Sequence, residues 1–133
     1  MSRTHFLPWA RDLIFRRSEG LKTVTVKDVS EHLNLKLLVG DNLDKEVKNG
    51  YCGDLLSWVM SKAQSNDCWF TVIGNVNAVA VAMLTDVSCV VLTEDAVLDD
   101  DARQKASIQD IIILQSDKSS YELSYMLAGF LND

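Results

Sequence analysis

Residues 69–93, WFTVIGNVNAVAVAMLTDVSCVVLT, decide the fold because they hold two apolar strands joined by a segment of crossover length. Residues 69–73 are rich in β-branched and aromatic side chains, and residues 87–92 carry no charge. Strands that are apolar on both faces belong inside a sheet covered on both sides, which is the parallel α/β arrangement. The 13 residues from 74 to 86 suffice for a parallel crossover.

The segment 78–84 is predicted to be the crossover helix. Three alanines alternate with other residues here, and Asn77 precedes the segment as a candidate N-cap. Because Val79 and Val81 are β-branched, periodicity alone leaves a strand open as the alternative. Crossover length and alanine content favour the helix.

The segments on either side alternate between helices and strands. TVKD at 25–28 has capping-box spacing and opens a helix over 25–34, and SSYE at 119–122 is a second capping box for a C-terminal helix. Residues 54–63 carry a broad apolar face, with Asp54 as the expected N-cap. A short helix is expected at 99–106, and further strands at 35–39, 47–52 and 110–115.

One strand is ambiguous, because Asn49-Gly50 could instead form a tight turn within 47–52. With that strand included, the order of elements predicts an α/β fold of three layers, α/β/α, around a mostly parallel sheet.

The first twenty residues differ from the rest in charge. Residues 1–20 carry four arginines against two acidic residues, a net charge of +2, whereas residues 21–133 carry nine basic and 17 acidic residues, a net charge of −8. We expect a disordered extension or a start-site artefact at 1–20, followed by one α/β domain at 21–133. The artefact hypothesis supposes that Arg16 and Arg17 are encoded by a ribosome-binding sequence and Leu21 by a TTG start codon. A basic amphipathic segment that touches a membrane or partner is the alternative.

Composition excludes several classes of protein. A hydrophobic content of 47% with a single proline is typical of a globular chain. No apolar run reaches the length of about 18 residues that a membrane span needs. Since residues 21–133 are strongly acidic, nucleic acid is not expected as a partner. The three cysteines, Cys52, Cys68 and Cys89, lie in or beside apolar runs and are predicted to be reduced and buried, which favours the cytoplasm.

Catalytic motifs are not found in the sequence. It contains neither GxxxxGK[ST] nor GxGxxG, the loops that hold nucleotide phosphates. His5 and His32 lack cysteine or carboxylate neighbours at metal-ligand spacing, and His32 is expected at the surface. A nucleophilic pair of Cys52 and His32 is a minor alternative to simple packing of the thiol. No catalytic residue, metal or cofactor is therefore predicted, and the aromatic residues Trp58, Trp69 and Phe70 are expected in the core or an interface.

Candidate ligand-binding residues lie where the predicted strands end. In open α/β sheets, ligands bind at the carboxyl ends of the strands, beside helix N-termini. Glycines there allow close approach to the backbone, and asparagine, threonine and serine supply donors and acceptors. An alternative remains open, in which the same residues serve only as turns, helix caps and solvated acids. The candidates are Gly53, Asp54, Gly74, Asn75, Asn77, Thr93, Glu94 and Ser116.

The order of these features resembles that of a known family. Residues 69–95, WFTVIGNVNAVAVAMLTDVSCVVLTED, followed by an acidic connector, an apolar strand and SYELSYML at 120–127, resemble the DRTGG domain, which also occurs as a stand-alone bacterial protein. Residues 25–56 are similar to the opening of that module and to the N-terminal domain of HPr kinase/phosphorylase. The similarity covers about residues 23–130.

The resemblance implies a regulatory or scaffolding module without catalysis, commonly a homodimer, with a nucleotide-like small molecule or a partner enzyme as its ligand. An accessory role to a phosphotransfer enzyme is the alternative. Two departures fall at the strand ends: many members carry Gly-Asp-Arg where this chain has Gly74-Asn75-Val76, and Thr-Gly-Gly where it has Thr93-Glu94-Asp95. A lost arginine and two added acids predict that phosphorylated ligands are held poorly.

Overall fold

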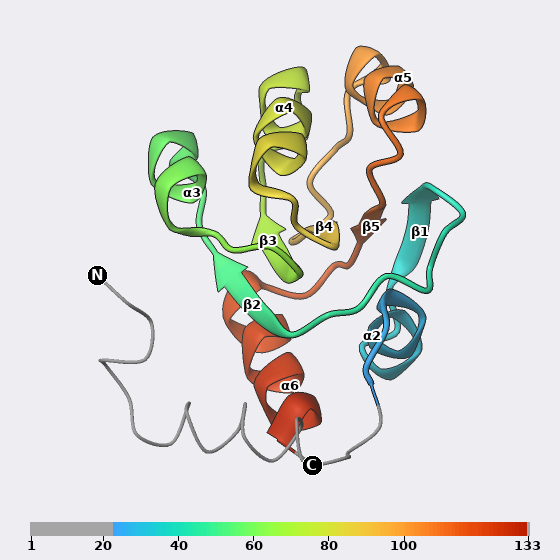
Figure 1. Ribbon diagram of the computed structural model, residues 1–133, viewed down its shortest axis with the longest axis vertical. Helices are drawn as coiled ribbons and strands as arrows, with labels where there is room; N and C mark the ends of the chain where they lie inside the picture. Colours follow the sequence, from blue (N-terminus) through green and yellow to red (C-terminus); the bar gives the residue numbers. More distant parts are fainter. Residues whose placement is uncertain (1–22, 133) are drawn as a thin grey trace.

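The computed structural model describes residues 23–132. The expectations for residues 1–20 therefore lie outside the described residues. Helices and strands alternate through most of the described chain (Figure 1). The helices are α2 (Val26–His32), α3 (Leu56–Lys62), α4 (Val76–Thr85), α5 (Asp100–Ile108) and α6 (Ser120–Asn132). The strands are β1 (Lys36–Val39), β2 (Asn49–Cys52), β3 (Asp67–Thr71), β4 (Cys89–Leu92) and β5 (Ile113–Gln115).

The five strands form one mostly parallel sheet in the order β1-β5-β4-β3-β2. Three neighbouring pairs, β2 with β3, β3 with β4 and β4 with β5, are parallel, and only β1 runs antiparallel to its neighbour β5. Strands β3 and β4 are buried at every position, as their apolar composition predicts for neighbouring strands covered on both faces. The predicted α/β class and mostly parallel sheet are confirmed.

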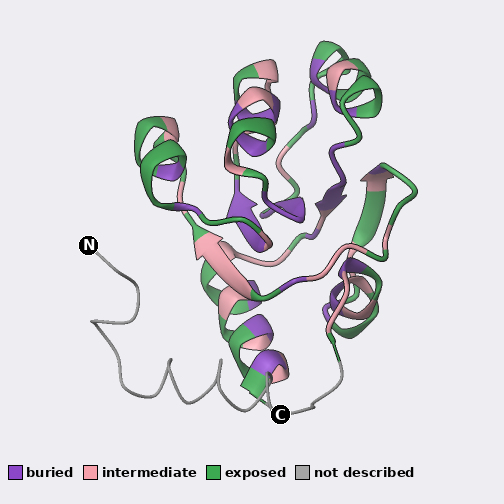
Figure 2. Cartoon of the chain, in the orientation of Figure 1, coloured by how far each residue is buried: buried purple, intermediate pink, exposed green. Residues whose placement is uncertain are grey.

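Helices cover both faces of the sheet, which confirms the three-layer arrangement. One face packs against α3, α4 and α5 through a core centred on Val59, Trp69 and Ala82. The other packs against α2 and α6 through Val29, Phe70 and Leu127. Figure 2 shows the buried residues concentrated on the central strands and on the helix sides that face them. Trp69 and Phe70, adjacent in sequence, thus serve opposite cores because successive strand residues point to opposite faces.

The helix starts confirm some sequence predictions and correct others. Thr25 and Asp28 form the predicted capping box, and the Ser119 hydroxyl accepts from the Glu122 backbone N–H at 3.1 Å. The predictions for Asp54 and Asn77 are wrong. Helix α3 begins after Leu55, because Asp54 is turned toward β3, and Asn75 rather than Asn77 is the N-cap of α4.

Three further expectations at β2 and α3 are resolved. Asn49 and Gly50 lie within β2, paired in parallel with β3, so the tight-turn alternative is wrong. Cys52 is exposed, contrary to its predicted burial, because it is the last residue of β2, an edge strand that has a neighbouring strand on one side only. Trp58 is 59% exposed on α3 and is not a core residue.

In the described part of the chain, no helix is both long enough and apolar enough to cross a bilayer.

Candidate functional site

The parallel pairing brings the candidate residues to one edge of the sheet. Strands β2 to β5 run in the same direction, so the loops after Cys52, Thr71, Leu92 and Gln115 all lie at their carboxyl ends. All eight residues predicted as ligand-binding fall in these loops or at the helix start that follows them. We call this region the carboxyl edge. Its residues are joined by hydrogen bonds that cross from one loop to the next.

Asp54 links the ends of β2 and β3. Its Oδ1 accepts from the Thr71 hydroxyl at 2.8 Å and from the Val72 backbone N–H at 2.9 Å. Next to it, the Gly53 carbonyl accepts from the Trp69 indole N–H at 2.9 Å. Thr71 is fully buried, so its hydroxyl needs such an acceptor. Sequence reasoning missed Thr71, although a hydroxyl at the end of an apolar strand was an available signal.

Asn75 closes the N-terminus of α4 with its own side chain. Its Oδ1 accepts from the backbone N–H groups of Asn77 at 3.0 Å and Ala78 at 3.1 Å. The Asn77 side chain is exposed on the first turn of the helix. Two of the amides that an anion would use at this terminus are therefore already satisfied within the chain.

Gly74 allows another segment of the same chain to approach its backbone closely. A Cβ at this position would overlap the carbonyl oxygen of Val97 and lie 2.9 Å from its carbonyl carbon. The Gly74 carbonyl accepts from the Asp99 backbone N–H at 2.8 Å. Glycine is thus required here for the β4–α5 connector to cross over the β3–α4 loop.

Thr93 and Ser116 are buried hydroxyl residues directly after β4 and β5. The Thr93 Oγ1 lies 2.8 Å from the Ser120 Oγ at the start of α6. The Ser116 hydroxyl accepts from the Lys118 backbone N–H at 3.1 Å. Ser120, which the sequence-based candidate set omitted, is therefore a neighbour of Thr93, and the capping-box pattern at 119–122 was the signal that placed it at a helix start.

Glu94 and Asp95 form a left-handed turn on the surface of this edge. Their φ angles are 56° and 54°, in the region that L-residues avoid. The Glu94 N–H donates to the Lys118 carbonyl at 2.8 Å, and the Asp95 N–H donates to the Ser116 carbonyl at 2.9 Å. Both side chains are exposed, so the turn presents two carboxylates to solvent.

Large apolar side chains are exposed around the same edge. Each of the four parallel strands is followed by one: Leu55 after β2 (61% exposed), Val72 after β3 (40%), Val97 after β4 (75%) and Tyr121 after β5 (82%). These four side chains leave apolar surface in the loops of the carboxyl edge.

The charge of the carboxyl edge is strongly negative. Its loops carry five acidic residues against Lys118, a formal net charge of −4, the acidic residues being Asp54, Glu94, Asp95, Asp99 and Asp117. Within residues 23–132, no group of three or more histidine, cysteine or acidic side chains is placed to hold a metal ion. His32 lies on α2, where its ring stacks on Phe130 of α6 at 4.1 Å between centroids.

The two buried thiols lie together in the middle of the sheet. Cys68 of β3 and Cys89 of β4 are register partners, and both are free. The hydrogen bond with Cys89 and burial, together with the nearby Asp67, raise the pKa of the Cys68 thiol well above its ordinary value. Cys68 is therefore a protonated packing residue and not a nucleophile.

The described residues therefore form a small α/β domain whose parallel strands end in loops of polar, acidic and exposed apolar residues. No family model matches the sequence, and no curated protein matches it. Among solved structures, the chain is similar to the crystal structure of the CBS and DRTGG domains of the regulatory region of Clostridium perfringens pyrophosphatase, complexed with the activator diadenosine tetraphosphate. The TM-score is 0.64 at 9% sequence identity, and the match covers 86% of this chain and 54% of that chain. At this identity the likeness concerns the fold, which is DRTGG-like.

Proposed function

We propose that this protein is a non-catalytic, cytoplasmic regulatory module that forms a homodimer and senses a nucleotide-like small molecule, or contacts a partner enzyme, at its carboxyl edge. The observation that carries the proposal is the chemistry of that edge. Buried hydroxyls and exposed carboxylates are held there by hydrogen bonds between neighbouring strand ends, for example between Thr71 and Asp54, and exposed apolar side chains such as Leu55 and Val97 lie in the same loops. Such an edge offers recognition groups around a rigid base. The likeness to a regulatory region supports the same reading by analogy of fold.

Charge decides which part of a nucleotide-like ligand this edge favours. A net charge of −4 in the loops repels phosphate groups, and Asn75 already occupies two amides of the α4 N-terminus. The exposed apolar side chains suit a base, and the exposed Asn77 amide suits the hydroxyl groups of a sugar. We therefore propose an uncharged, nucleoside-like ligand in preference to a nucleoside triphosphate.

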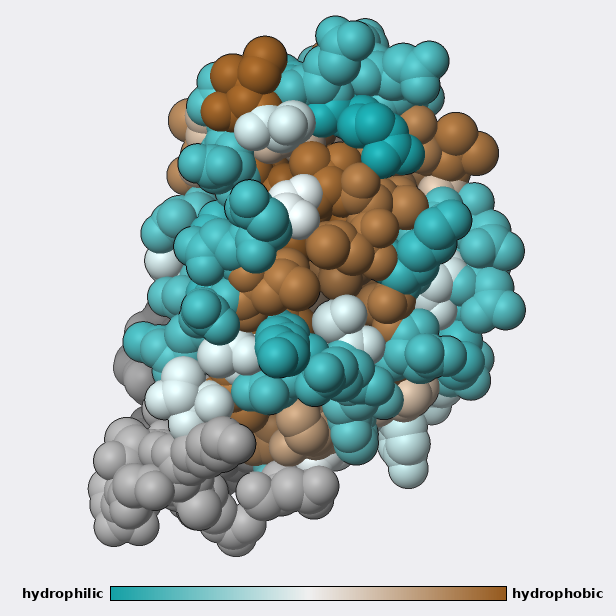
Figure 3. Space-filling view, turned by 90° about the vertical axis from the view of Figure 1, so that its right-hand side faces the viewer, coloured by the Kyte–Doolittle hydropathy of each residue, from teal (hydrophilic) through white to brown (hydrophobic). Residues whose placement is uncertain are grey.

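The β1 edge is the surface that best fits a second copy. Strand β1 is an edge strand, so one of its two sides has open backbone groups. Leu37 on this strand is 42% exposed. Figure 3, which looks onto the side of the molecule that carries β1, shows a hydrophobic patch at its centre framed by hydrophilic residues. Two copies related by a two-fold axis would pair β1 with β1 and cover both patches at once.

Binding is tested by the fluorescence of Trp69, which is buried in β3. Trp69 donates to the Gly53 carbonyl, so its emission reports on the strand ends. In a Trp9→Phe/Trp58→Phe variant of the full chain, only Trp69 remains to emit. Adenosine and guanosine are expected to change this emission at lower concentration than their triphosphates. Tighter binding of the triphosphates would contradict the charge argument, and no response to any of them would shift the proposal to partner contact alone.

The dimer is tested separately by mass. Native mass spectrometry and light scattering of the full chain are expected to report twice the 14.9 kDa chain mass. Leu37→Glu places a charge on the β1 edge and is expected to give monomers, whereas Lys36→Glu changes a neighbouring exposed side chain and serves as the control. A monomeric wild-type chain would overturn this part of the proposal without touching the ligand site.

A further inference from the structure

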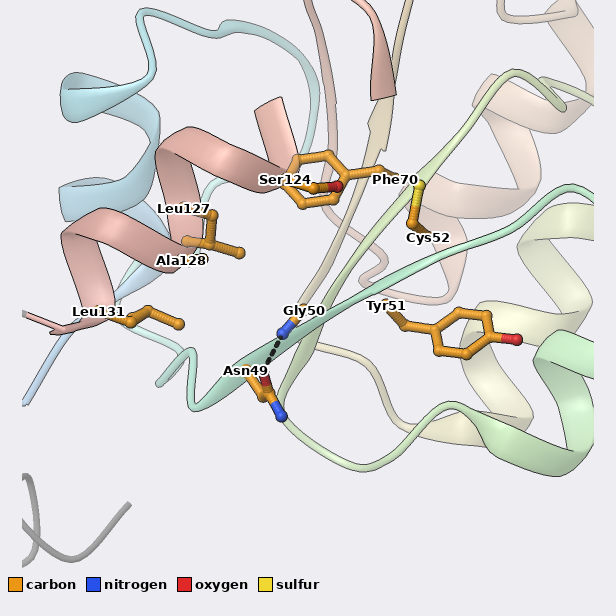
Figure 4. Close-up of a pocket in the computed structure, with 9 residues that line it drawn as sticks. All are labelled: Asn49, Gly50, Tyr51, Cys52, Phe70, Ser124, Leu127, Ala128 and Leu131. Carbon is orange, nitrogen blue, oxygen red and sulfur yellow. Dashed lines mark hydrogen bonds between the residues drawn. The ribbon is translucent and has the colours of Figure 1, made fainter. Parts of the chain in front are cut away.

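A cavity lies between β2 and α6, on the sheet face opposite α3, α4 and α5. Its volume is about 180 Å³. Figure 4 shows Ser124, Leu127 and Leu131 of α6 on one side, and β2 with Phe70 on the other. The lining includes no acidic or basic side chain. This cavity is separate from the eight candidate residues of the carboxyl edge.

The shape of the cavity depends on a glycine in the edge strand. A Cβ at Gly50 would lie 2.9 Å from the Leu127 Cδ2, so a side chain at this position would displace the end of the Leu127 side chain in the cavity wall. Cys52 and Ala128 also line the cavity and are exposed to solvent, so the cavity reaches the surface of the molecule. An apolar cavity of about 150 Å³ is known to hold a benzene-sized molecule.

One polar atom in the wall lacks a partner. The Ser124 Oγ is buried, and among residues 23–132 no group forms a hydrogen bond with it. An unsatisfied buried hydroxyl destabilises a fold by about 1–3 kcal/mol, because it has lost water and gained nothing in return. If the Ser124 side chain turns toward the cavity, a ligand that brings one hydrogen-bonding group to its hydroxyl recovers that loss.

We propose that this cavity binds a small neutral molecule that has an apolar body about the size of a benzene ring and one hydrogen-bonding group for Ser124. The apolar walls made by Phe70, Leu127 and Leu131 select the body, since its burial is favourable. The lack of charged lining residues selects against ions, whose desolvation would go uncompensated. The site is independent of the carboxyl edge, so either proposal can fail alone.

The test uses phenol and toluene as matched probes, which differ by a hydroxyl in place of a methyl group. Both are titrated into the isotopically labelled full chain while backbone amide NMR shifts are followed. We expect shifts confined to β2 and to 124–131 of α6, with phenol binding more tightly than toluene. Ser124→Ala is expected to weaken phenol binding by about three- to tenfold, the value of one hydrogen bond, and to leave toluene unchanged.

Two further helix variants separate binding in the cavity from binding elsewhere. Ala128→Leu places a larger side chain in the cavity wall and is expected to abolish binding of both probes. Gly129→Ala is the control, because a Cβ there meets nothing within 4 Å. Unperturbed amides at saturating phenol, or binding that survives Ala128→Leu, would overturn the proposal. So would a change of oligomeric state in Ala128→Leu, since the cavity would then be a protein contact.

Discussion

Glu94 and Asp95 show why single residues at the strand ends carry information. Both adopt left-handed backbone angles, at φ 56° and 54°, where glycine is the residue without a steric cost. Two glycines would adopt these angles without that cost. The chain instead bears the cost of the left-handed turn and presents two carboxylates at its surface.

Gly74 gives the sharpest prediction at the residue scale. Gly74→Ala is expected to lower the free energy of unfolding by about 2–3 kcal/mol or more, because the new Cβ would overlap the Val97 backbone, which cannot move as a flexible side chain can. Urea unfolding followed by circular dichroism measures the loss. Gly129→Ala, in open space on α6, is expected to leave stability unchanged or raise it by up to about 1 kcal/mol. Equal effects of the two changes would show that the β4–α5 connector does not need glycine at this crossing.

The Cys68 thiol predicts how stability depends on pH. Its hydrogen bond with Cys89 and its burial raise its pKa in the folded protein, so the folded state holds this proton more tightly than the unfolded chain does. The resulting stabilisation is fully present below the unfolded cysteine pKa of about 8.5 and decreases as the pH rises above it. Urea unfolding between pH 7 and 9.5 is expected to show a steeper decrease for the wild type than for Cys68→Ala. Parallel curves for the two proteins would exclude the Cys68 thiol as the source of the pH dependence.

At the scale of elements, Asp54 links the ends of β2 and β3 by hydrogen bonds and does not cap α3. Asp54→Ala removes the acceptor for both the Thr71 hydroxyl and the Val72 N–H, so we expect a loss of about 1–3 kcal/mol in the free energy of unfolding. Asp54→Asn keeps an Oδ1 acceptor and is expected to lose less. Asp44→Ala, at an exposed acid of the β1–β2 loop, is expected to change stability by less than about 0.5 kcal/mol. An Asp54 effect no larger than that of Asp44 would mean that the link does not hold the strand ends together.

Asp54 also shows how far elements follow from sequence. The buried strands and the helix faces were predictable, because apolar periodicity depends on burial, which the whole fold enforces. The helix caps were harder to predict from the sequence. A polar residue before a helix can cap it or can turn to a neighbouring strand, and only the pairing of β2 with β3 decides between these outcomes for Asp54. For α4, Asn75 and Asn77 are chemically equivalent caps, and the start of the helix at Val76 selects Asn75.

At the scale of the whole molecule, the sequence predicted where the carboxyl edge lies but not the contacts between its loops. Strand direction alone brings the candidate loops together, so their common position follows from the predicted topology. The use of Gly74 by the Val97 backbone and the contact of Thr93 with Ser120 depend on how connectors cross, which no local pattern encodes. The β2–α6 cavity escaped prediction for the same reason, since it depends on how two elements distant in sequence pack together.

The charge of the whole edge gives the last prediction. Glu94→Gln/Asp95→Asn removes two of the exposed carboxylates, so at low salt the affinity for ATP is expected to rise by about tenfold while adenosine binding stays the same. Asp41→Asn/Asp44→Asn makes the same change in net charge at the opposite end of the sheet, because β1 runs antiparallel to β5 and the β1–β2 loop lies at the amino ends of the parallel strands. Calorimetric titration at 20 mM and 300 mM salt separates the two pairs, since only the local effect should distinguish ATP from adenosine and fade with added salt. If both pairs raise ATP affinity equally, overall charge and not the carboxyl edge governs binding. If neither does, phosphate groups do not approach this edge at all, and a ligand there must be recognised through its base and sugar alone.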